Sequence, residues 1–149
     1  GGPFVDEAVG TALLLIGVLA VTDARNLAPI SNLGPLIIGF VVFAVGTSFG
    51  ANTGYAINPA RDFGPRVFAF FAGWGKVALP GTYNLGGFQF SNYFWIPIVA
   101  PLVGAVIGAL AYDFFIGDVL QARSARTGKS GEAQAEPGEG QPNVQPNRA

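Results

Sequence analysis

Residues 54–66 read GYAINPARDFGPR, a charged and proline-bearing stretch between two long apolar segments. Asn58 is a good helix N-cap, and Pro59 suits the first helical position, where its missing N–H costs nothing. Ala60, Arg61 and Asp62 continue the first turn. A short helix whose positive end faces a cavity, with an arginine beside it, can handle small polar solutes. The stretch therefore predicts the start of a short helix that can bind small polar solutes.

The composition around this stretch indicates a membrane protein. Half of the 149 residues are hydrophobic and only 11% are charged, against about 25% in soluble domains. The net charge of −1 gives no electrostatic reason to expect a nucleic-acid partner. The chain has no Cys and no His, so we expect no disulfide, no metal and no cofactor. It also has no Met, from which we expect a fragment or a processed product.

Three apolar segments approach the roughly 20 residues that a membrane-spanning helix needs. The first covers about residues 4–22 and takes Glu7 below the headgroups, where a carboxylate must face protein rather than lipid. An interfacial carboxylate is the alternative. The second covers residues 33–51 without a charge, and the third covers residues 93–116. We expect three transmembrane helices.

Small residues in these segments predict close helix packing. Gly39 interrupts the second segment, while Gly104 and Gly108 form a small-xxx-small face on the third, extended by Ala100. Such faces let membrane helices approach one another closely.

Between the second and third segments, residues 59–72 are 14 residues long, about 21 Å as a helix. This helix reaches halfway across a bilayer, and residues 80–90 after it read as a Gly-rich loop. The fold class is therefore an all-α membrane protein with three transmembrane helices and one re-entrant half-helix, within residues 1–116. The polar tail, 117–149, is expected to be disordered.

The charges near the last segment predict an orientation. Arg123, Arg126 and Lys129 follow it closely, which predicts a cytoplasmic tail and a half-helix that enters from outside.

The residues around Asn58 suit a solute with hydroxyl groups, or water. The side-chain oxygen of Asn58 caps the helix, which leaves its amide N–H₂ free to donate. The preceding segment, Gly54 to Ile57, is expected to run extended with a ladder of unpaired carbonyls, including that of Ala56. Arg61 would repel cations and donate to hydroxyls. The alternative is that Arg61 pairs with Asp62 or a loop carbonyl.

Residues 54–66 resemble the second Asn-Pro-Ala box of the major intrinsic protein family, the aquaporins and aquaglyceroporins. The resemblance covers about residues 4–117 and matches the C-terminal half of that fold, the second of its two inverted repeats. It implies that Asn58, Pro59 and Ala60 lie at the pore. It also implies that Glu7 is a buried acid that accepts hydrogen bonds from the backbone of the re-entrant loop.

Four positions resemble glycerol channels rather than strict water channels. Water channels usually carry Ser, a small residue, two adjacent aromatics and a filter histidine at these positions. In the same order, this chain instead has Asp62, Arg66, the pair Pro97-Ile98, and Gly46. The resemblance implies that Gly46 widens the constriction. It also implies that Tyr55 lines its apolar side and Arg61 binds hydroxyls, while Asp62 anchors the surroundings of Arg61 or ties down the loop through Arg66.

The resemblance implies passive diffusion of glycerol, similar small neutral polyols and water, in a plasma membrane and as a homotetramer of complete channels. The family pore uses two half-helices from inverted repeats, so we expect this chain alone not to conduct. The alternative is a non-conducting half-channel that regulates full-length subunits.

An intramembrane aspartyl protease using Glu7, Asp62 or Asp113 is disfavoured. Such enzymes need two facing carboxylates that share a proton, whereas Arg61 and Arg66 favour ionised Asp62. We therefore expect no catalytic residue.

Overall fold

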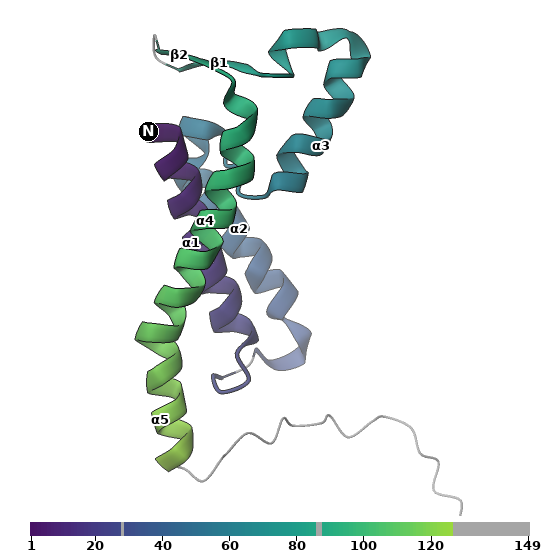
Figure 1. Cartoon of the computed structure of the whole chain (residues 1–149). Helices are drawn as coiled ribbons and strands as arrows, with labels where there is room; N and C mark the ends of the chain where they lie inside the picture. The colour runs from purple at the N-terminus through teal and green to yellow at the C-terminus, as the bar shows by residue number, and fades with distance from the viewer. Residues whose placement is uncertain (28, 86–87, 127–149) are drawn as a thin grey trace, which may run out of the picture.

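The computed structural model describes residues 1–27, 29–85 and 88–126, which form a helical bundle (Figure 1). In this described part, three helical runs are long and apolar enough to cross a membrane. They are α1 (Gly2–Thr22), α2 (Gly34–Thr53) and the run Tyr93–Ala125, which contains α4 (Ile96–Tyr112). A short 3-10 turn, Ile30–Asn32, precedes α2. The predicted class, an all-α membrane protein, is confirmed.

Helices α1 and α4 pack closely because two glycines of α4 lie against the backbone of α1. A Cβ added at Gly108 would lie 2.5 Å from the carbonyl oxygen of Ala12, and one at Gly104 would overlap the carbonyl oxygen of Ala8. Ala100, one turn earlier on the same face, is fully buried. The predicted small-residue face on the third segment is confirmed.

Helix α2 packs against α1, where a Cβ on Gly17 would lie 2.7 Å from a Val41 methyl. Phe40 and Phe43, on other parts of α2, are exposed in the part of the chain that the structure describes. Gly39 would meet nothing within 4 Å if it gained a Cβ, so the close packing expected at Gly39 is not made by the described residues of this chain. The periodicity of small residues does not say which face a neighbour covers.

The predicted half-helix is α3, Pro59–Ala69, followed by a π-helical turn, Phe70–Trp74, and a 3-10 turn, Gly75–Val77. Figure 1 shows α3 starting beside the middle of the bundle and running toward the end that holds the N-terminus. The expected loop over residues 80–90 contains two short antiparallel strands, β1 (Thr82–Leu85) and β2 (Phe88–Ser91). A 3-10 turn, Tyr93–Trp95, leads into α4.

The prediction of a disordered tail from residue 117 is wrong for its first ten residues. Helix α4 continues through a π-helical turn, Asp113–Gly117, into α5, Asp118–Arg126. A helix that extends an existing one avoids the cost of nucleation, and α5 contains Leu120 and other good helix formers. Residues 127–149, the rest of the predicted tail, lie outside the described residues.

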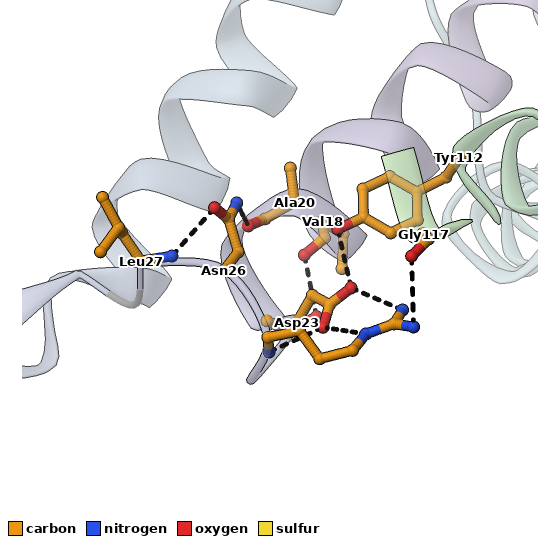
Figure 2. A network of polar contacts seen from close by, with 9 residues as sticks. Val18, Ala20, Asp23, Asn26, Leu27, Tyr112 and Gly117 are labelled. Carbon is orange, nitrogen blue, oxygen red and sulfur yellow. Dashed lines mark hydrogen bonds and ion pairs between the residues drawn. The ribbon is translucent and has the colours of Figure 1, made fainter. Parts of the chain in front are cut away.

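A polar network ties the end of α1 to the end of α4 (Figure 2). The carboxylate of Asp23 accepts hydrogen bonds from the Arg25 guanidinium at 2.9 and 3.0 Å and from the Tyr112 hydroxyl at 3.0 Å. Arg25 also donates to the carbonyl of Gly117, at 3.5 Å, inside the π-helical turn. The network therefore holds the α1–α2 turn against the point where α4 becomes α5.

The hydrogen bonds from Arg25 hold the pKa of the Asp23 carboxyl well below its ordinary value of 3.8. A carboxyl with a lowered folded-state pKa stabilises the fold above its unfolded pKa and loses this contribution as the pH falls toward the folded one. We therefore expect Asp23→Asn to lower the melting temperature equally from pH 7 to about pH 5, and the deficit to shrink below about pH 4. A deficit that disappears by pH 6 in a thermal melting series would contradict this assignment.

Candidate functional site

The start of α3 is built as the sequence predicts. Asn58 is the N-cap, and its Oδ1 accepts from the backbone N–H groups of Ala60 at 2.9 Å and Arg61 at 3.3 Å. Pro59 occupies the first turn. Asn58 is exposed, so its amide nitrogen can donate to a ligand in front of the helix.

Glu7 holds the segment ahead of α3. It is 1% exposed, and its Oε1 and Oε2 accept from the N–H groups of Ala56 at 2.9 Å and Ile57 at 2.7 Å. A nest-like turn in the backbone points successive N–H groups to one side, where they can bind an anion. Tyr55 and Ile57 accordingly both have φ of 43°. The expected extended conformation is therefore wrong, because both amides must face one carboxylate, and the interfacial alternative for Glu7 is also wrong.

Arg61 folds back over the same segment. Its Nη1 donates to the carbonyl of Tyr55 at 2.9 Å and to that of Ala56 at 3.4 Å. Its guanidinium carbon lies 4.6 Å from the centre of the Tyr55 ring. Of the alternatives, the loop-carbonyl contact is present and the Asp62 pair is not. Two carbonyls of the expected ladder are thus already bound, and the positive charge stays exposed beside the helix start.

The Tyr55 ring fills the space that two glycines of α2 leave open. A Cβ at Gly46 would lie 3.1–3.3 Å from ring atoms of Tyr55, and one at Gly50 would lie 2.8 Å from the ring. Gly46 therefore leaves room that this chain fills with its own aromatic side chain. The implied widening is smaller than the change from histidine to glycine alone suggests.

Asp62 pairs with Arg66 instead of Arg61. The two side chains make a two-point ion pair, with Arg66 Nη2 lying 3.1 Å from Asp62 Oδ1 and a second contact from Arg66 Nε. The Arg66 guanidinium carbon also lies 5.2 Å from the centre of the Tyr93 ring. Of the two implied roles for Asp62, the geometry fits the one in which Asp62 holds the loop by pairing with Arg66. An open hollow of about 290 Å³ lies beside Arg61, Asp62 and Arg66.

The other predicted residues lie in α4 and in the turn that follows it. Pro97 is buried in the first turn of α4, and Ile98 is half-buried beside it. Asp113 lies exposed in the π-helical turn after α4. The described residues contain no group of three or more His, Cys, Asp and Glu side chains that could hold a metal.

Four residues that the sequence did not single out for function also lie at this site. They are Asp6, Asn52, Thr53 and Tyr93, which hydrogen-bond with one another around the end of α2. The only sequence signal for them was a second carboxylate next to Glu7 at the edge of an apolar segment.

The fold and the site define a class: an integral membrane protein in which a short helix, with a buried carboxylate behind its start, presents polar groups beside the middle of the helical bundle. The chain belongs to the major intrinsic protein family, whose model matches residues 1–112. The resemblance seen in the sequence is thereby confirmed.

Curated relatives match the same part of the chain. The glycerol uptake facilitator protein of Escherichia coli strain K12 is 47% identical over 114 residues, which are 76% of this chain and 38% of the relative. Aquaporin-10 of Homo sapiens is 42% identical over 113 residues, 76% of this chain and 35% of that protein. The propanediol uptake facilitator PduF of Citrobacter freundii is 44% identical over 120 residues, which are 80% of this chain and 42% of that protein. The chain thus spans well under half the length of these relatives.

Proposed function

We propose that this chain forms one half of a channel for the passive diffusion of glycerol, similar small neutral polyols and water. The observation that carries the proposal is the arrangement at the start of α3. There the exposed Asn58 amide and the exposed Arg61 guanidinium can both donate hydrogen bonds, and the Tyr55 ring packs against Arg61. Hydrogen-bond donors beside an aromatic ring suit a molecule with hydroxyls on a carbon backbone. The names of the relatives agree with this class of solute.

Proton and cation exclusion follows from the same group. The N-terminus of α3 carries the positive end of a helix dipole, and Arg61 adds a full positive charge that no carboxylate neutralises within the described residues. A positive barrier of this kind repels hydronium and metal cations while neutral solutes pass. No reaction takes place, and Asn58, Pro59, Ala60 and Arg61 act only by lining the path.

Conduction needs a second half that brings an inverted half-helix to the same depth. One half-helix supplies donors from one side only, and much of α2 away from α1 is exposed among the described residues. Homotetramers of the complete channel, a plasma-membrane location and a cytoplasmic C-terminal tail belong to the same proposal. The positive residues after α4 support the orientation of the tail. The alternative partner is a full-length channel subunit that this chain would regulate.

The experiment compares two preparations in proteoliposomes: the chain alone, and the chain fused behind the N-terminal half of the Escherichia coli relative. We expect the fusion to raise glycerol permeability above that of empty vesicles in stopped-flow light scattering, and the chain alone to leave it unchanged. In the fusion, Arg61→Ala should alter the ratio of glycerol to water permeability. Lys76→Ala, which removes an exposed positive charge beyond α3, is the matched control and should not. A folded, monodisperse fusion without glycerol permeability would overturn the proposal.

A further inference from the structure

We propose that Asp6 is a positioning residue for the constriction, because it fixes the end of α2 so that Tyr55 and Arg61 keep their places. This inference rests on the proposed function, in which these two side chains form the filter. It concerns a residue that neither the sequence pattern nor the family resemblance indicated.

The carboxylate of Asp6, in the second turn of α1, binds the last turn of α2 at two points. Its Oδ1 accepts from the Asn52 amide at 3.0 Å, and its Oδ2 accepts from the Thr53 hydroxyl at 2.8 Å. The Tyr93 hydroxyl donates to the Thr53 carbonyl, at 3.2 Å, from the turn before α4. The end of α2 is therefore attached to both neighbouring helical runs.

Asp6 and Glu7 together fix the two ends of one short segment. Asp6 holds Asn52 and Thr53, and Glu7 holds the amides of Ala56 and Ile57. The residues between these attachments are Gly54 and Tyr55 alone. The position of the Tyr55 ring is thus determined from both sides.

The backbone between the attachments is in a conformation that needs such support. Gly54 has φ of 78° and Tyr55 has φ of 43°, so both are left-handed. A non-glycine residue in this region is strained and persists only when its surroundings hold it. If the Asp6 contacts are lost, Tyr55 can relax. The ring then leaves Gly46 and Gly50, and Arg61 loses its hydrogen bond to the Tyr55 carbonyl.

The first test measures the position of Tyr55 directly. The full chain carries a fluorotyrosine at position 55 in lipid nanodiscs and is observed by fluorine NMR. We expect Asp6→Ala to shift the resonance or split it. Asp6→Asn keeps an acceptor for Asn52 and offers a donor to the Thr53 hydroxyl oxygen, so it should restore the wild-type resonance. Tyr112→Phe removes an interhelical hydrogen bond at the opposite end and should leave the resonance unchanged.

The second test uses the fusion with the N-terminal half of the Escherichia coli relative. Asp6→Ala is expected to change the ratio of glycerol to water permeability. Tyr112→Phe should leave this ratio unchanged. If the wild-type fusion fails to conduct, the proposed function fails, and the fluorine spectra still decide the role of Asp6. If Asp6→Ala does not fold, Asn52→Ala and Thr53→Val remove its contacts singly and should each shift the resonance. A wild-type Tyr55 signal in every folded variant overturns the inference.

Discussion

Glu7→Ala is expected to lower the free energy of unfolding by about 2–6 kcal/mol, because it leaves two buried N–H groups without acceptors at about 1–3 kcal/mol each. These are the amides of Ala56 and Ile57, which bind the two oxygens of a side chain that is 1% exposed. Without the carboxylate, no other acceptor among the described residues binds these two N–H groups. The positive φ at Tyr55 and Ile57 should then be lost.

The measurement is a thermal melt in detergent, combined with amide hydrogen exchange at Ala56 and Ile57. Glu7→Gln should lie between the wild type and Glu7→Ala, because its amide oxygen accepts from one N–H while its N–H₂ opposes the other. Thr11→Val is the matched control, one turn along the same buried face. Its hydroxyl bonds to the carbonyl of Glu7 within α1 at 2.7 Å, so its loss should cost far less. Wild-type protection of both amides in Glu7→Ala would show that the carboxylate does not hold the loop.

The helices that cross the membrane could be predicted from the sequence because apolar length alone decides them. The N-cap at Asn58 was also predictable, since capping depends on neighbours in the chain. The backbone of residues 54–57 was not, because its conformation is imposed by Glu7, some 50 residues away. Helix α5 was missed for another reason: its polar composition resembles disorder, but it extends a helix that already exists.

In the candidate site, too, local features could be predicted from the sequence and tertiary contacts could not. Arg61 could be predicted because a charged residue stands out in an apolar chain. The ion pair between Asp62 and Arg66 was one of two roles that the sequence left open for Asp62. What Arg61 contacts depends on tertiary geometry, and the sequence left the Asp62 pair and the loop carbonyl both open. The contact of the Tyr55 ring with Gly46 and Gly50 joins two elements across a turn. Spacing along one helix carries no information about it.

Gly104→Ala is expected to destabilise the bundle by about 3 kcal/mol, the upper part of the usual range for overpacking. The added Cβ would overlap the carbonyl oxygen of Ala8, and a backbone group cannot turn aside as a long side chain can. Gly39→Ala adds the same methyl group to a helix where nothing lies within 4 Å, so it should be neutral or stabilise by up to about 1 kcal/mol through helix propensity. In the same nanodiscs, Gly104→Ala should therefore lower the melting temperature, whereas Gly39→Ala should leave it unchanged or raise it. Equal losses in both would mean that glycine acts through helix flexibility, and that the close approach of α1 and α4 does not set the stability of the half-channel.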